Sequence, residues 1–99
     1  MTIDIQYLKM PSSETLDNII IKKLNKLSNK YSWLIRADVL IKTENYKGVV
    51  NKCCDIELSC PGPKIFAKSI EDDYEKAVVN TINDLTRQLK KRKQQFSKF

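Results

Sequence analysis

The chain has 99 residues, of which 41% are hydrophobic and 30% are charged, and its formal net charge is +6. This length and composition are typical of one soluble domain that can bury a hydrophobic core without disulfides or metals. The sequence contains no histidine and only two glycines. These absences argue against an enzyme and against a bound metal or cofactor, because they remove the commonest general base, most transition-metal sites and any glycine-rich phosphate loop.

The net charge is concentrated in the last thirteen residues, 87–99, which hold six basic side chains and no acidic one. The preceding residues hold twelve of each sign, so their charges cancel. A neutral body with one basic end is typical of a protein that docks on a polyanion.

The three cysteines, Cys53, Cys54 and Cys60, fit neither a disulfide framework nor a zinc site, because their number is odd and no CxxC spacing occurs. We therefore expect reduced thiols. The longest apolar run, Ile19 to Ile21, is far too short to span a membrane, and the N-terminus lacks the regions of a signal peptide. We expect a cytoplasmic protein without membrane contact.

The first predicted elements are a strand and a helix. Strict alternation of apolar and polar residues predicts a strand over residues 2–8. The Pro11–Ser13 segment breaks this strand and supplies an N-cap. A helix is predicted from Glu14 to Tyr31, because its apolar residues recur at three- and four-residue steps and form one stripe.

A row of lysines follows this helix at Lys22, Lys26 and Lys30. Their i, i+4, i+8 spacing places all three along one flank of the apolar stripe. Such a row is in general a solvated helix face whose aliphatic stems cover the edge of the core. Because no acidic residue is interleaved, the row also forms a positive ridge.

The next predicted elements are three strands. Alternation predicts strands over residues 35–42, 50–58 and 65–68, with a loop over 43–48 and a turn at Pro61–Gly62–Pro63. Ile35 belongs to the apolar set of the first of these strands. The turn makes the other two strands a hairpin.

The last predicted element is a helix that begins near Glu71. Acidic residues gather in its expected first turn and basic residues in its last, which suits the helix dipole. Its apolar stripe faces inward, whereas Arg87 and Lys91, with Lys90 beside them, point outward. Arg92 occupies a position of the apolar stripe, so from there we expect the helix to project beyond the sheet or to fray.

The element order is therefore β-α-β-β-β-α. It predicts an α+β fold of two layers, in which both helices cover one face of a four-stranded sheet. For Tyr31 and Trp33 we expect packing against the core, because stacking modules display aromatic side chains on an open surface. For Phe96 and Phe99 two interpretations stay open, a contact with RNA or a partner and a frayed terminus.

The segments DIELSCPGPKIFAKS and DDYEKAVVNTINDLTRQLKK, in this order, resemble the ribosome hibernation-promoting factor family, which includes ribosome-associated inhibitor A. The stretch KKLNKLSNKY also matches, and the resemblance covers nearly the whole chain. It implies a fold similar to a double-stranded-RNA-binding domain. It also implies a stress-response protein of stationary phase, which sits in the messenger and transfer RNA channel of the small ribosomal subunit and silences idle ribosomes.

In that family, basic residues on the two helices contact ribosomal RNA. Carried over position by position, the resemblance implies this role for Lys23, Lys26, Arg87 and Lys91. Helical geometry adds their neighbours Lys22, Lys30 and Lys90. We call these seven residues the candidate cations.

Long members of the family continue into a second domain that pairs two ribosomes. We expect this chain to be a single ribosome-binding domain over residues 1–99, without a C-terminal dimerisation domain. We also expect it to be monomeric off the ribosome and to inhibit ribosomes without pairing them by itself.

The alternative interpretation is a generic double-stranded-RNA-binding or translation-associated protein without a hibernation role. A third possibility, a small enzyme acting on a small molecule, has little support. Asp55 and Glu57 share one strand face, but the pattern brings no nucleophile or polar partner to them. We expect both carboxylates to face water.

Overall fold

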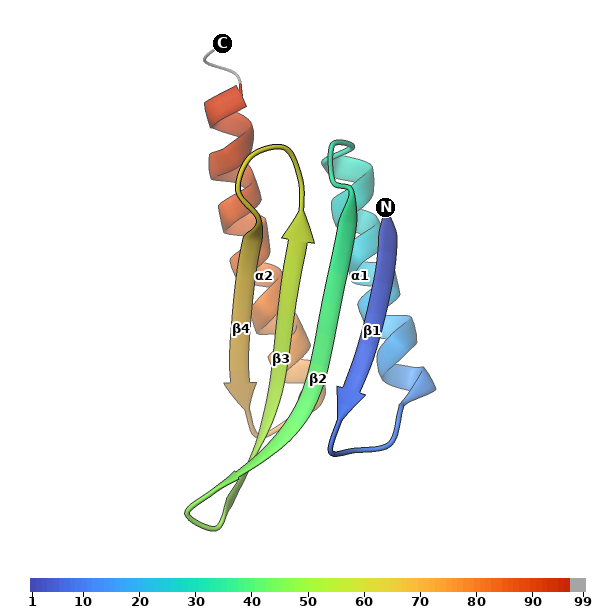
Figure 1. Cartoon of the computed structure of the whole chain (residues 1–99), viewed down its shortest axis with the longest axis vertical. Helices are drawn as coiled ribbons and strands as arrows, with labels where there is room; N and C mark the ends of the chain where they lie inside the picture. The colour runs from blue at the N-terminus through green and yellow to red at the C-terminus, as the bar shows by residue number, and fades with distance from the viewer. Residues whose placement is uncertain (97–99) are drawn as a thin grey trace.

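The protein folds as two layers, a four-stranded sheet and a pair of helices that cover one of its faces (Figure 1). The computed structural model describes residues 1–96. In chain order the elements are β1 (Thr2–Leu8), α1 (Glu14–Lys30), β2 (Arg36–Tyr46), β3 (Val49–Ser59), β4 (Ile65–Glu71) and α2 (Tyr74–Phe96). This order confirms the predicted α+β fold.

The strands lie in the order β1-β2-β3-β4. Because β1 and β2 pair in parallel, the chain must cross over between them, and α1 makes that crossover. The β2–β3 and β3–β4 pairs are antiparallel hairpins. As a result, α1 and α2 run in the same direction, and their carboxyl ends lie at the same end of the molecule (Figure 1).

The hydrophobic core lies between the two layers. On β2, Ala37, Val39 and Ile41 are buried toward the helices, as the alternation predicted. The buried residues of the helices are Leu16, Ile20, Leu24 and Leu27 of α1 and Ala77, Val78, Thr81, Ile82, Leu85 and Leu89 of α2. One apolar face per element is therefore removed from water, which is the main driving force for this fold.

The two helices begin at side-chain caps. Ser13 caps α1, as predicted, and its Oγ accepts a hydrogen bond from the Leu16 amide at 3.2 Å. The predicted start of α2 near Glu71 is wrong. Glu71 pairs with Lys52 as the last residue of β4, and the Asp73 carboxylate accepts the Glu75 amide at 3.0 Å just before the helix. The acidic cluster thus serves as strand end and cap, and only Glu75 lies in the first turn.

The loop predicted over residues 43–48 is also wrong, because most of it is strand. Residues 43–46 continue β2 and pair with 49–52 of β3. The connection is only two residues long, Lys47 and Gly48, and both have positive φ, 51° and 78°. A two-residue turn with both φ angles positive matches the twist of a hairpin, so the ladder can continue to the turn.

Ile35 does not belong to the core-facing set, contrary to the alternation. It precedes β2, and 61% of its surface is exposed. A turn in which the Leu34 amide donates to the Tyr31 carbonyl brings Leu34 into the core instead. The alternation is therefore interrupted where the chain leaves the turn.

Two side chains between the layers have raised pKa values. The Tyr7 hydroxyl donates to Asp17 Oδ1 at 2.7 Å, and burial, together with this bond, raises the pKa of Tyr7 to about 12. Burial likewise raises the pKa of the Cys54 thiol to about 12. Cys53, Cys54 and Cys60 are all free and buried. Tyr7 and Cys54 therefore stay neutral well above pH 7.

Candidate nucleic-acid interface

The lysine row of α1 lies on the surface, as predicted. Lys22, Lys26 and Lys30 are exposed, and Lys23 beside them is half-buried. At a rise of 1.5 Å per residue, the three exposed lysines span about 12 Å along the helix. Lys30 also lies over the Tyr31 ring, with 5.6 Å between its Nζ and the ring centroid.

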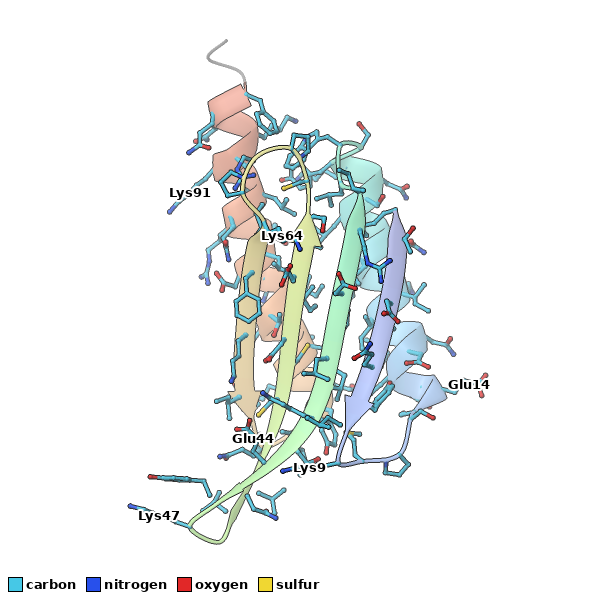
Figure 2. The ribbon with its side chains drawn as sticks, viewed as in Figure 1. Lys9, Glu14, Glu44, Lys47, Lys64 and Lys91 are labelled. Carbon is cyan, nitrogen blue, oxygen red and sulfur yellow. The ribbon has the colours of Figure 1, made fainter. Side chains whose placement is uncertain are left out.

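The outward side of α2 carries the other candidate cations. Arg87, Lys90 and Lys91 are exposed, whereas Leu85 and Leu89 on the inward side are fully buried. Lys91 projects away from the helix and the sheet in Figure 2. The predicted division of α2 into an inward and an outward side is confirmed.

Most of the candidate cations have no acidic partner in the part of the chain that the structure describes. Among residues 1–96, Arg87 alone of the seven makes an ion pair, with Asp84 at 3.4 Å. This pair is exposed, so it holds Arg87 only weakly. The ammonium groups of Lys22, Lys26, Lys30 and Lys91 are thus available to an external anion.

The same end of the molecule gathers these cations from both helices. Lys30 is the last residue of α1, and Lys91 lies in the last turns of α2. Because the two helices run in the same direction (Figure 1), both lysines lie toward the same end of the molecule. The partial negative charge at a helix carboxyl end favours cations there, so this arrangement costs little stability. Both helices therefore carry candidate cations toward the same end of the molecule, from two separate segments of sequence.

The end of α2 is held in place by contacts that the sequence did not reveal. The last turns of α2 project beyond the sheet, as one of the two expectations had it (Figure 1). They do not fray, since Arg92 Nη1 donates to the Pro61 carbonyl at 3.0 Å and lies 3.4 Å from Cys60 Sγ. The Phe96 ring packs edge-on against Trp33, with 5.0 Å between their centroids. These contacts fix the helical turns that carry Lys90 and Lys91.

The aromatic residues after α1 pack as predicted. Tyr31 is buried in the core, and Trp33 lies edge-on against it at 5.6 Å. Phe96 completes this cluster, which contradicts the frayed terminus; a contact of Phe96 with RNA or a partner stays a prediction. Phe99 lies outside the described residues. One feature of the sequence could have predicted this cluster. Tyr31 and Trp33 follow the first predicted helix, and Phe96 lies near the end of the second.

The face of the sheet opposite the helices is also charged. Its cations Arg36, Lys42 and Lys64 are paired, whereas the exposed Lys68 makes no ion pair within residues 1–96. Arg36 contacts Asp4 at 3.3 Å and Asp38 at 2.9 Å. Lys64 contacts Glu57 at 2.8 Å. Cross-strand register brings these groups together, since the strand positions of Asp4, Asp38 and Glu57 are direct neighbours. We call this surface the open sheet face.

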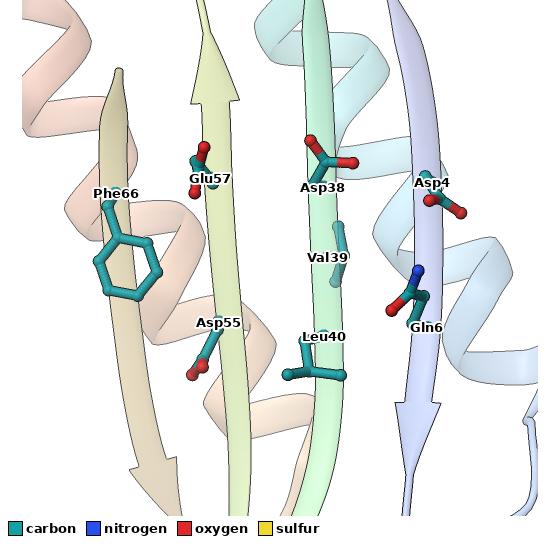
Figure 3. Close-up of a pocket in the computed structure, with 8 residues that line it drawn as sticks. All are labelled: Asp4, Gln6, Asp38, Val39, Leu40, Asp55, Glu57 and Phe66. Atoms are coloured by element: carbon teal, nitrogen blue, oxygen red, sulfur yellow. The ribbon is translucent and has the colours of Figure 1, made fainter. Parts of the chain in front are cut away.

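A cavity of about 230 Å³ lies on the open sheet face (Figure 3). Its lining residues are Asp4, Gln6, Asp38, Val39, Leu40, Asp55, Glu57 and Phe66. The expectation that Asp55 and Glu57 both face water without partners is wrong. The Asp55 side chain is only 17% exposed and lies 3.5 Å from Lys42, and Glu57 pairs with Lys64. Within residues 1–96, Asp55 Oδ1 is buried without a hydrogen-bond partner.

The sequence matches the model of the family described as sigma 54 modulation protein / S30EA ribosomal protein over residues 3–97. The chain belongs to this family. The match confirms the resemblance to the hibernation-promoting factor family and makes this a ribosome-associated protein.

Solved structures share the fold of this family member. A ribosomal subunit interface protein from Coxiella burnetii superposes with a TM-score of 0.84 and 24% identity, covering 94% of this chain and 98% of its own. The N-terminal domain of Protein Y from Thermus thermophilus superposes with a TM-score of 0.77 and 18% identity, covering 92% of this chain and 98% of its own. Among curated proteins, none matches this chain.

Two further findings concern residues 1–96. No described helix is both long and apolar enough to cross a membrane. The described cysteines and carboxylates form no group of three or more that is placed to hold a metal ion.

Proposed function

We propose that the helix layer binds ribosomal RNA of the small subunit in the messenger and transfer RNA channel, and that the bound protein blocks translation by occupancy. The observation that carries this proposal is the contrast in pairing. Six of the seven candidate cations lack an acidic partner within residues 1–96, whereas Arg36, Lys42 and Lys64 on the open sheet face are paired. Unpaired cations gain most from meeting phosphates, because no internal ion pair has to be broken first.

The mode of recognition follows from the residue types. Lysine and arginine on helices neutralise phosphates, and double-stranded RNA is recognised by shape and backbone rather than by base edges. If about five of the candidate cations meet phosphates, the logarithm of affinity should fall against the logarithm of salt concentration with a slope of roughly −4 to −5. A slope near zero would contradict the electrostatic basis of the proposal.

The test compares two double variants that remove the same charge. Arg87→Ala with Lys91→Ala removes two cations from the helix layer. Lys64→Ala with Lys68→Ala removes two exposed cations on the sheet side. Binding of each to purified small subunits is measured over a range of salt concentrations.

We expect the helix variant to bind roughly tenfold more weakly and its salt slope to be shallower by about 1.5 to 2. The sheet variant should bind like the parent. Equal loss in both variants would show that net charge alone drives binding. Excess duplex RNA added as competitor separates the hibernation role from the generic alternative, because a channel-specific protein should stay on empty small subunits. Translation of an added message should fall with the fraction of ribosomes occupied.

A further inference from the structure

The end of the β2–β3 hairpin, residues 45–50, projects from the body of the molecule (Figure 1). We call these residues the hairpin tip. The pairing of β1 with β2 ends at Lys42, and the pairing of β4 with β3 begins at Lys52, so the tip has only its own two strands for support. The molecule is about 50 Å long, and the tip lies at the opposite end from the carboxyl end of α2.

All six residues of the tip are exposed, although three of them are large and apolar. Tyr46 is 66% exposed, Val49 is 59% exposed and Val50 is 51% exposed. Tyr46 and Val49 are cross-strand partners and therefore lie on one face of the ribbon. A grouping of exposed apolar side chains on a projecting ribbon marks a surface that is used for contact.

The turn residue Lys47 adds a positive charge at a position whose backbone conformation is unfavourable for lysine. Its φ of 51° lies in the left-handed region, where the first residue of such a hairpin turn is commonly Asn, Asp or Gly. The lysine is thus not the residue that the turn itself prefers. Its Nζ lies 5.4 Å from the centroid of the Tyr46 ring, so an ammonium group and an aromatic face are presented together.

The charge of the tip itself is of the sign that a polyanion attracts, whereas the acidic residues that begin the two helices lie back from the tip, toward the same end of the molecule. The tip contains one basic residue and no acidic one. Figure 2 shows Lys9 and Lys47 at this end of the molecule, and the nearby Glu44 is paired with Lys42 at 3.1 Å. An aromatic side chain beside a lysine is a combination with which proteins bind single-stranded RNA, by stacking on a base and neutralising a phosphate.

We infer that the hairpin tip is a second RNA contact, in which an unpaired base stacks on Tyr46 and Lys47 binds a neighbouring phosphate. The inference rests on the proposed function, because the RNA is ribosomal RNA of the particle that the helix layer binds. The distance between the tip and the carboxyl end of α2 means that the two surfaces contact different RNA segments. The tip would recognise a loop or bulge, since bases within a duplex are not available for stacking.

Three variants separate the ring, the apolar surface and the charge. Tyr46→Phe keeps an aromatic ring, and its affinity for small subunits should stay within about twofold of the parent. Tyr46→Leu keeps an apolar side chain but removes the ring, and its affinity should fall roughly 5- to 150-fold if one base is stacked. Equal affinity of Tyr46→Leu and the parent would overturn the inference.

Lys47→Asn tests the charge without harming the turn, because Asn tolerates positive φ better than Lys does. The variant should unfold at the same or a higher denaturant concentration than the parent. Its salt slope for small-subunit binding should nevertheless be shallower by about 0.7 to 0.9, as expected for one lost phosphate contact. An unchanged slope would argue against a phosphate at this lysine.

A photo-crosslinking phenylalanine derivative at position 46 identifies the partner, with the same derivative at the exposed Phe66 of the open sheet face as control. We expect position 46 to crosslink to ribosomal RNA and position 66 not to. A crosslink to ribosomal protein alone, or none in bound complexes, would overturn the inference.

If Arg87→Ala with Lys91→Ala loses binding while Tyr46→Leu binds normally, only this inference fails. If the parent protein does not bind small subunits, the proposed function fails with it.

Discussion

The helix layer and the open sheet face differ less in the kind of charge they carry than in how that charge is paired. The sheet face pairs Arg36, Lys42 and Lys64 with carboxylates at 2.8–3.5 Å. The helix layer leaves most of its lysines without such partners in the described part of the chain. A lysine can therefore be paired within the protein or left available to an external anion, depending on what the fold places beside it. The net charge of +6 does not reveal this division.

The difference has a geometric cause in each layer. Residues two apart on a strand point to the same face, which brings Arg36 to Asp38 and Lys42 to Glu44. Diagonal neighbours on adjacent strands are also within reach of long side chains, which brings Lys42 to Asp55. Along α1, by contrast, the acids Glu14 and Asp17 lie in the first turn, whereas the lysines begin at Lys22. This segregation suits the helix dipole and keeps the two signs too far apart to pair.

The two sides of α2 give the largest expected contrast in stability. Leu85 is fully buried, and Leu85→Ala should lower the free energy of unfolding by roughly 2–5 kcal/mol, because it leaves a cavity between the layers. Lys91→Ala, on the exposed side, should change it by less than about 0.5 kcal/mol. Urea denaturation of both variants checks the assignment of the helix faces. A similar loss in both would contradict it.

The buried thiol of Cys54, between the layers, should also make the free energy of unfolding fall with rising pH in the alkaline range. The pKa of the Cys54 thiol is raised from 9.0 to about 12 by burial, so between these values the unfolded chain loses a proton that the folded chain keeps. The contribution is fully present below pH 9 and is lost at about 1.4 kcal/mol per pH unit above it, or about 2 kcal/mol by pH 10.5. Urea denaturation at several pH values should show a shallower decline in Cys54→Ala. An equal decline in the variant and the parent would assign the effect to other groups.

The sequence predicted the architecture of both layers because each element carries a clear apolar period. The stripe of α1, its Ser13 cap and the bounds of β1 needed only local pattern. The outward position of Arg87 and Lys91 followed from the same helical period. The residues whose placement the sequence predicted well are thus those whose surroundings are set by their own element.

The residues that the sequence misplaced depend on other segments. Arg92 occupies a position of the apolar stripe, and only the Pro61 carbonyl, brought close by the β3–β4 turn, explains why a charge is tolerated there. The partners of Asp55 and Glu57 come from β2 and from the β3–β4 turn, through strand register. The pairing contrast between the two surfaces therefore could not be predicted from the sequence pattern.

Arg92 and Lys91 are neighbours with expected roles of opposite kind. Arg92→Ala removes a hydrogen bond of 3.0 Å to Pro61 and should lower the free energy of unfolding by about 1 kcal/mol. It should leave the salt slope of ribosome binding unchanged, because its guanidinium is occupied within the protein. Lys91→Ala should do the reverse, with little loss of stability and a slope shallower by about 1. Urea denaturation and salt-dependent ribosome binding of both variants test these opposite expectations. If the two variants have equal salt slopes, Arg92 also contacts RNA.

The smallest expected effect comes from making the open sheet face resemble the helix layer. Glu57→Gln removes the carboxylate whose hydrogen bond raises the pKa of Lys64, and so releases that lysine from its ion pair. The variant should bind an unspecific polyanion such as heparin about twofold more tightly, since one more unpaired cation is available. Stability should hardly change, because an exposed pair of this kind contributes little. Lys64→Ala made in the Glu57→Gln background is the control, because it should return heparin affinity to the level of the parent. If Glu57→Gln binds heparin no more tightly than the parent does, ion pairing is not what keeps the sheet cations from binding a polyanion. The contrast between the two surfaces would then have another cause.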